Sequence, residues 1–116
     1  MFERGKIVLV PFPFTDLCSS KIRPALIISD PKLTGEDVTV VFISSNISRG
    51  TKSTDYTVGP THPHYQQTGL KIASVIRCGK VATLDKKIVL GEIGSLPSSV
   101  QKEIDRRIRL YLGLAN

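Results

Sequence analysis

The feature of this sequence that most suggests chemistry is an arginine at the start of an apolar run. Arg23 follows a polar loop, residues 15–22, and precedes Pro24 and a stretch of aliphatic residues. Pro24 has no backbone N–H and favours an extended conformation for the residue before it. Arginine keeps its charge, and its planar fork matches the oxygens of a phosphate. The pattern indicates an anion-binding residue at the mouth of a strand, and an ion pair with Asp16 is the alternative.

The histidines and cysteines form no recognisable metal or redox motif. His62 and His64 make a His-x-His pair, but no further ligand nearby completes a zinc site, so a solvated loop is expected. Cys18 and Cys78 lie far apart and are expected to be reduced thiols, and no motif around either favours a Cys–His nucleophile pair. The sequence therefore permits catalysis without a metal ion or a cofactor.

Length and charge limit the classes of function. The chain has 116 residues, of which 41% are hydrophobic, and a net charge of +6. We expect a single domain, residues 1–116, because this length suits one modest core. The apolar runs are strand-length and the first residues lack a signal-peptide pattern, which predicts a cytoplasmic protein. The positive charge suits a polyanionic partner, since Lys and Arg release counterions from phosphates, or serves solubility alone.

Short segments rich in β-branched residues predict a mostly β domain. The expected strands are Lys6–Pro11, Arg23–Ser29, Asp37–Ser44, Thr54–Val58, Ser74–Thr83 and Lys87–Ile93. Residues 30–36 are expected to form a turn-rich connection, and residues 59–64, with two prolines and a glycine, an irregular one. The continuous apolar run of the second strand predicts burial on both faces, and Gly79 predicts a bend in the fifth.

One helix is expected, at residues 98–112. Its apolar residues recur four positions apart and give one apolar face; they are Val100, Ile104, Ile108 and Tyr111 or Leu112. Ser98 with Gln101 three residues later fits a capping box, and Gly113 is a natural stop. Short strands followed by one helix predict an α+β domain dominated by β-structure.

Several segments resemble the MazF/PemK family of bacterial toxins from type II toxin–antitoxin systems. The most specific are Gly5–Phe14 and Arg23–Ser29, and they are supported by Val38–Ile47, Ser74–Asp85 and Ile93–Pro97. The resemblance implies a small SH3-like barrel of antiparallel strands with a packed C-terminal helix. It also implies an endoribonuclease that cleaves single-stranded messenger RNA at a short sequence, works as a homodimer and is neutralised by a cognate antitoxin.

The resemblance places the catalytic groups of the family on Arg23 and Ser44. In the implied metal-independent reaction, the 2′-hydroxyl of RNA attacks the adjacent phosphorus and leaves a 2′,3′-cyclic phosphate and a 5′-hydroxyl. Arg23 is expected to stabilise phosphate charge, because a guanidinium is not deprotonated in proteins. Ser44 stands where the best-matching members carry threonine and keeps the hydroxyl donor. Because Ser45 points to the opposite face of a strand, only one of the two serines should face the site.

A second group of residues is expected to bind RNA around these two. Its members are Thr15, Lys21, Ser45, Asn46, Arg77 and Lys80, with Arg49 and Lys52 as further phosphate contacts. Cations of this kind position a nucleic-acid backbone, while Asn46 is placed to read a base edge. Phe14 and Tyr65 are candidates either to stack on bases or to pack locally, and Phe42 is expected in the core. A contact of His62 or His64 with the RNA is the alternative to the solvated loop.

Two other functions fit the fold that the resemblance implies. One is a non-catalytic toxin that binds gyrase, as CcdB does, and the other is an RNA-binding barrel without activity. The strand-entry arginine and the strand-end hydroxyl favour the ribonuclease. The final residues, 113–116, lack the tryptophan on which gyrase binding of the CcdB kind depends.

Overall fold

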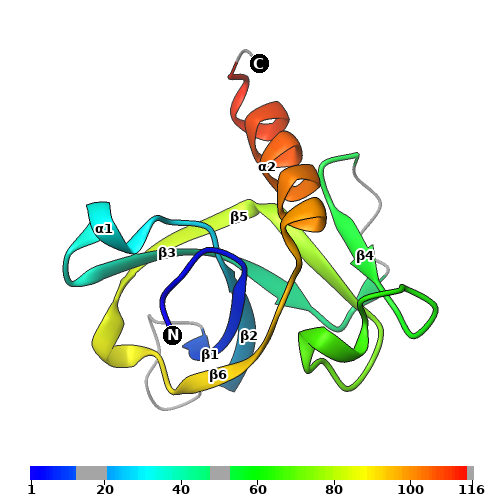
Figure 1. Cartoon of the computed structure of the whole chain (residues 1–116), viewed down its shortest axis with the longest axis horizontal. Coiled ribbons are helices and arrows are strands. Elements are labelled where there is room, and N and C mark those ends of the chain that lie inside the picture. The colour runs from blue at the N-terminus through cyan, green and yellow to red at the C-terminus, as the bar shows by residue number, and fades with distance from the viewer. Residues whose placement is uncertain (13–20, 48–52, 115–116) are drawn as a thin grey trace.

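The chain folds into a curled antiparallel sheet with a helix packed at one end (Figure 1). The computed structural model describes residues 1–12, 21–47 and 53–114. The strands are β1 (Lys6–Phe12), β2 (Lys21–Ile27), β3 (Asp37–Ser44), β4 (Tyr56–Val58), β5 (Ser74–Asp85) and β6 (Gly91–Ser95). They lie in the order β4-β5-β3-β2-β1-β6. The helices are α1 (Pro31–Thr34) and α2 (Ser98–Leu112), with 3₁₀ turns η2 (Gln66–Thr68) and η3 (Lys86–Ile88). The predicted α+β class, mostly β with a C-terminal helix, is confirmed.

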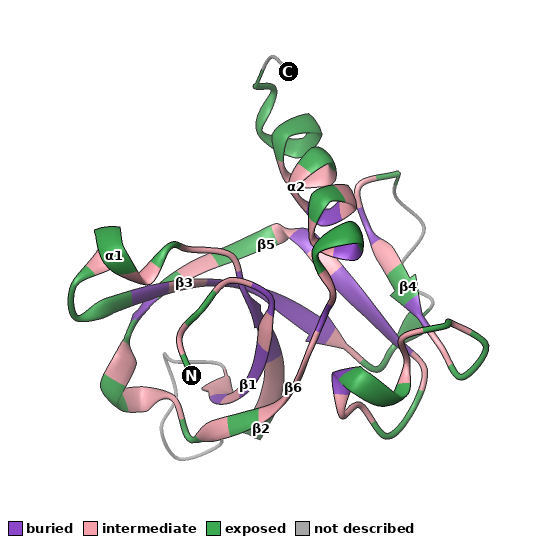
Figure 2. Ribbon diagram, in the orientation of Figure 1, coloured by how far each residue is buried: buried purple, intermediate pink, exposed green. Residues whose placement is uncertain are grey.

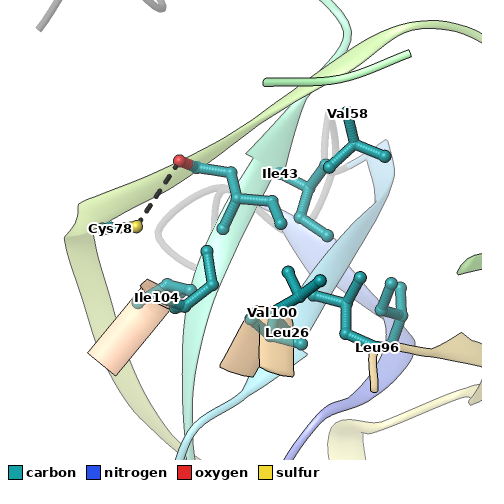
Figure 3. Close-up of a cluster of buried hydrophobic side chains, with 10 residues drawn as sticks. Leu26, Ile43, Val58, Cys78, Leu96, Val100 and Ile104 are labelled. Carbon is teal, nitrogen blue, oxygen red and sulfur yellow. Dashed lines mark hydrogen bonds between the residues drawn. The ribbon is translucent and has the colours of Figure 1, made fainter. Parts of the chain in front are cut away.

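Both faces of the central strands are buried, as the apolar run of the second strand predicts. Successive residues of a strand point to opposite faces, so Leu26 joins one hydrophobic cluster while Ala25 and Ile27 join another. The first cluster lies against α2, whose Val100 and Ile104 point at the strands (Figure 3). The second cluster is covered by partly buried residues that include Phe2 and Val89.

The long strand β5 carries an irregularity in the middle. Val41 of β3 pairs with Val81, but the adjacent Phe42 pairs with Arg77, so residues 78–80 are inserted relative to β3. Extra residues of this kind form a bulge that bends the strand. The bend predicted at Gly79 is therefore confirmed.

Helix α2 is buried most deeply through its first half. Val100 and Ile104 are buried and Ile108 is partly buried, but Tyr111 and Leu112 are each 54% exposed. Figure 2 shows the last turns of α2 exposed as the helix leaves the sheet. The predicted apolar face therefore continues to Tyr111, whose ring lies against Gly79 of β5, although more than half of that side chain stays exposed. None of the described helices is long and apolar enough to cross a bilayer.

The ends of α2 differ in how well they were predicted. Pro97 occupies the N-cap position, and no side chain caps the first turn. The expected capping box is wrong, because the Gln101 side chain donates to the Leu96 carbonyl at 2.8 Å. The predicted stop is confirmed, since Gly113 adopts a left-handed φ of 72° and its N–H reaches the carbonyls of the last turn.

Two connections differ from their predictions. Residues 30–36 contain the short helix α1, which begins where the Asp30 carboxylate accepts from the Lys32 N–H at 2.9 Å. The strand expected at Lys87–Ile93 starts only at Gly91, because the Asp85 carboxylate accepts from the Lys87 N–H at 2.8 Å and the chain winds into η3. Residues 59–64 are irregular, as predicted, and the short strand predicted from Thr54 begins at Tyr56.

Candidate functional site

Most of the described candidate residues meet in one hollow of about 280 Å³. It is lined by Phe12, Arg23, Phe42, Ile43, Ser44, Ser45, Asn46, Arg77 and Lys80. These residues come from β1, β2, β3 with the turn after it, and β5. Residues with three cationic side chains and two hydroxyls therefore line a cavity beside two aromatic rings, which suits an anionic ligand with an apolar part.

The strand register explains why Arg23 and Ser44 lie on the same face. Ala25 of β2 pairs with Phe42 of β3 in the antiparallel ladder. Arg23 lies two residues before Ala25, and Ser44 lies two residues after Phe42. Residues two apart on a strand share a face, so both side chains project beside Phe42 at the same end of the sheet. Arg23 is half-buried and, within the described part of the chain, forms no ion pair with a carboxylate. Its alternative partner, Asp16, lies outside the described residues.

Ser44 and Ser45 both line the hollow, and the expectation that only one of the two side chains faces it stays a prediction. β3 ends at Ser44, and the chain turns at Ser45, so strand alternation no longer holds there. The Ser44 Oγ accepts from the Asn46 N–H at 3.1 Å. That contact uses a lone pair of the oxygen and leaves the hydroxyl hydrogen able to point into the hollow.

Two cations of β5 complete the positive lining. Arg77 stands opposite Phe42, and its Nε lies 3.4 Å from the Oδ2 of Asp55, a carboxylate whose side chain is only 4% exposed. Lys80 Nζ lies 5.4 Å from the centre of the Phe12 ring, within cation–π range. The Phe12 and Phe42 rings are 4.7 Å apart and inclined at 44°. Phe42 is buried, as predicted, and also forms part of the floor of the hollow.

Not every candidate reaches the hollow. Lys21 is exposed at the start of β2 and does not line it. Tyr65 is half-buried and packs against the core, as its local-packing alternative expects. The predictions for Thr15, Arg49, Lys52, Phe14 and Cys18 fall outside the described residues. The sequence reasoning missed Asp55, because a carboxylate before a short strand shows its partner only when the register of β4 on β5 is known.

The histidines belong to a hydrogen-bonded loop beside β4, so the expectation of a merely solvated loop is wrong. His62 is half-buried; its Nδ1 accepts from the His64 N–H at 3.1 Å, and its Nε2 lies 2.8 Å from the Tyr56 hydroxyl. Nδ1 must carry a lone pair to accept, so Nε2 is the protonated nitrogen and donates to Tyr56. The His62 ring therefore connects the loop at residues 62–64 to Tyr56 of β4 through hydrogen bonds.

Cys78 is a buried thiol under α2 (Figure 3). Burial raises its pKa to about 12, so the thiolate is absent at neutral pH. Its Sγ lies 3.8 Å from the Ile76 carbonyl. The disfavoured reading of Cys78 as a nucleophile therefore gains no support. Within the described ranges, no three His, Cys, Asp or Glu side chains gather as a metal site would require.

The fold and the hollow define a class of small half-barrel proteins, built from a curled six-stranded antiparallel sheet, a C-terminal helix and a cationic site. The chain belongs to the PemK-like, MazF-like toxin family of type II toxin–antitoxin systems, whose family model matches residues 3–112. The family that the sequence resembles is thereby confirmed.

Solved structures establish the same fold. The Mycobacterium tuberculosis toxin MazF-mt6 is 21% identical, with a TM-score of 0.76, over 96% of this chain and 99% of that one. An endoribonuclease in complex with its cognate antitoxin, from a mycobacterial species, is 20% identical, with a TM-score of 0.73, over 98% and 97%. MazF from Deinococcus radiodurans is 20% identical, with a TM-score of 0.72, over 97% and 96%. No curated protein sequence matches the chain.

Proposed function

We propose that this protein is a metal-independent endoribonuclease toxin that cleaves single-stranded messenger RNA at a short sequence in the cytoplasm. The observation that carries the proposal is the hollow in which Arg23, Arg77 and Lys80 surround the Ser44 hydroxyl. Phosphodiester cleavage builds negative charge on the phosphoryl oxygens, and preorganised cations and donors lower its barrier. The description of one structural neighbour as an endoribonuclease supports the same reaction class.

The proposed reaction uses the 2′-hydroxyl of the RNA as nucleophile. The 2′-hydroxyl gives its proton to water and its oxygen attacks the adjacent phosphorus, the bond from phosphorus to the 5′-oxygen breaks, and the leaving 5′-oxygen takes a proton from water. The products are a 2′,3′-cyclic phosphate and a 5′-hydroxyl. Arg23 clamps the scissile phosphate, and Ser44 donates to a phosphoryl oxygen, so that the protein orients the attack in line and neutralises charge.

The remaining polar residues bind the RNA around the scissile phosphate. Arg77 and Lys80 contact backbone phosphates, and Lys21 at the start of β2 contacts a further one. Thr15, outside the described residues, stays a predicted RNA contact. Ser45 and Asn46 face the base, where an amide has the donor and acceptor needed to read a base edge.

The decisive experiment is cleavage of a synthetic single-stranded RNA in excess EDTA. We expect cutting under these conditions, with new 5′ ends that accept phosphate from polynucleotide kinase without prior dephosphorylation. An all-2′-deoxy version of the same strand should remain intact, because it has no nucleophile. Cutting that requires added magnesium, or that leaves 5′-phosphates, would overturn the mechanism. Binding of RNA without cutting would support the inactive-barrel alternative.

The proposed active form is a homodimer. The last turn of α2 exposes Leu110, Tyr111 and Leu112, and Val81 of β5 is also exposed. Apolar side chains gathered in this way mark an interaction surface, and a second copy of the chain is the occupant we propose. Sedimentation at micromolar concentration should show a dimer, which Leu112→Glu disrupts and Leu33→Glu, at an exposed site on α1, leaves intact. A monomeric wild type contradicts the proposal.

A cognate antitoxin is the second proposed partner. The net charge of +6 suits an acidic, disordered tail that folds on binding and fills the cationic hollow. Structural neighbours described as MazE–MazF complexes support a toxin held by an antitoxin. Antitoxin binding should compete with RNA and weaken as salt is raised.

A further inference from the structure

The buried carboxylate of Asp55 stands between the candidate site and the C-terminal helix. Tyr56 of β4 pairs with Ile76 of β5, so continuing the antiparallel register sets Asp55 across from Arg77. The Asp55 Oδ2 and the Arg77 Nε are both buried, and neither makes a hydrogen bond within the described part of the chain. What joins them is the ion pair at 3.4 Å.

The terminal nitrogens of the Arg77 guanidinium face the hollow in which we place the RNA. Its Nε is buried against Asp55, while the side chain as a whole keeps 23% of its surface exposed. Arg77 also lines two adjoining hollows, the candidate site and a second one shared with Asp55 and Lys80. A guanidinium held at Nε presents its two terminal nitrogens, the pair of donors that grips a phosphate.

Asp55 is itself held in place from the helix. The Arg107 Nη1 donates to the main-chain carbonyl of Asp55, and the Arg107 Nε donates to Glu103 at 2.6 Å. The guanidinium of Arg107 also lies 5.1 Å from the centre of the Tyr56 ring. A side chain with so many contacts fixes the backbone at the start of β4, and therefore fixes the carboxylate that faces Arg77.

We infer that Asp55 is a positioning residue that orders the Arg77 guanidinium for a phosphate of the RNA next to the scissile one. This inference rests on the proposed function. Without Asp55, ordering a free arginine side chain costs as much binding free energy, through lost rotamer freedom, as one phosphate contact supplies. The contact would then no longer form, and its share of the salt dependence would be lost with it. An ion pair that served only to neutralise buried charge would leave RNA binding unchanged as long as the protein stayed folded.

The salt dependence of RNA binding separates the two roles. A single-stranded 2′-O-methyl RNA, which cannot be cleaved, is titrated at several potassium chloride concentrations. Each phosphate contact contributes about 0.7 to the slope of log K against log salt, or about fivefold in affinity at 0.1 M. Arg77→Gln should lower the slope by about this amount, and Asp55→Asn should lower it nearly as much. The double variant should bind no more weakly than Arg77→Gln alone.

Asp105→Asn is the matched control. It also removes an Asp–Arg ion pair, here with Arg4, at a place outside both hollows, and it should leave the slope unchanged. If Asp55→Asn keeps the wild-type slope while Arg77→Gln loses it, the positioning role is refuted. Additive losses in the double variant refute it as well.

A measurement on the wild-type protein covers the case in which Asp55→Asn does not fold. The Nε–H group of Arg77 should be ordered in ¹⁵N relaxation, whereas that of Arg109, exposed on α2, should be mobile. Equal mobility of the two overturns the inference. This readout needs no RNA, so a protein that neither binds nor cuts RNA would defeat the proposed function while leaving the ordering of Arg77 open to direct measurement.

Discussion

Replacing Arg23 by alanine tests the site assignment, because its expected effects on activity and on stability differ sharply. The side chain lies beside Ser44 in the hollow. Removing one donor to the transition state lowers the rate by a factor of about 100 to 1000, or about 3–4 kcal/mol. We therefore expect Arg23→Ala to cut RNA at least about 100-fold more slowly than wild type. Arg23→Lys keeps a charge but loses the planar fork, so its cleavage rate should lie between those of Arg23→Ala and wild type.

The same change should scarcely alter stability. Arg23 is half-buried and, in the described part of the chain, has no carboxylate partner that its removal would leave unpaired. Substitutions of that kind alter the free energy of unfolding by about 0.5 kcal/mol or less. For a domain of this size that corresponds to a shift in Tm of about 2 °C.

The assay pairs single-turnover cleavage of a labelled RNA with thermal unfolding followed by circular dichroism. Lys32→Ala, which removes a cation from exposed helix α1, is the control and should match wild type in both measurements. An Arg23→Ala protein that cuts at the wild-type rate would refute the site assignment. A fall in Tm of about 8 °C or more would show that Arg23 serves the fold instead.

Three further changes should have distinct outcomes. Ser44→Ala should slow cleavage about 10- to 100-fold, because a hydroxyl that donates to a charged oxygen is worth about 1.5–3 kcal/mol, and Ser44→Thr should retain activity; equal rates for alanine and serine would contradict the donor role. Gly69→Ala should cost about 2 kcal/mol or more in urea unfolding, because the residue has a φ of +72° and a Cβ would lie 2.0 Å from the Ile93 carbonyl oxygen. In a Cys18→Ser background, Cys78 should resist thiol reagents at pH 8 until the protein unfolds. Its pKa rises from 9.0 to about 12 on folding, so the free energy of unfolding should fall as pH rises from about 9 toward 12; rapid labelling of folded protein would contradict its burial.

The fold was largely predictable because burial imposes visible periodicities on the chain. The unbroken apolar run in β2 indicates two buried faces, and Leu26 and Ile27 do fall in different clusters. The errors in predicted secondary structure and burial arise where local contacts oppose the structure that the hydrophobic pattern predicts. The Asp85 side chain accepts a hydrogen bond that winds residues predicted as a strand into η3. The last turn of α2 touches β5 where Tyr111 lies against Gly79, so most of its apolar surface stays exposed.

The site was predictable only in its parts. Arg23 could be predicted as a site residue from its neighbours in the sequence, since proline follows it and a polar loop precedes it. Which residues of β2, β3 and β5 lie next to one another depends on the register of the strands, which the sequence does not reveal. Asp55 carries no local signal at all, because an acid before a short strand is normally exposed. Its partner becomes visible only when β4 is laid on β5, which brings together residues 22 positions apart.

The bulge in β5 explains how one strand can supply two cations to the same hollow. Arg77 and Lys80 are three residues apart, and on a regular strand residues at that spacing point to opposite faces. The insertion of residues 78–80 relative to β3 breaks the alternation between them, so both side chains reach the hollow. Gly79 lies at the bulge because a Cβ there would come within 2.2 Å of the Tyr111 ring. The Tyr111 ring at the end of α2 therefore lies against the bulge that brings Arg77 and Lys80 to one hollow. The surface we propose for dimer formation and the surface we propose for RNA meet at this bulge.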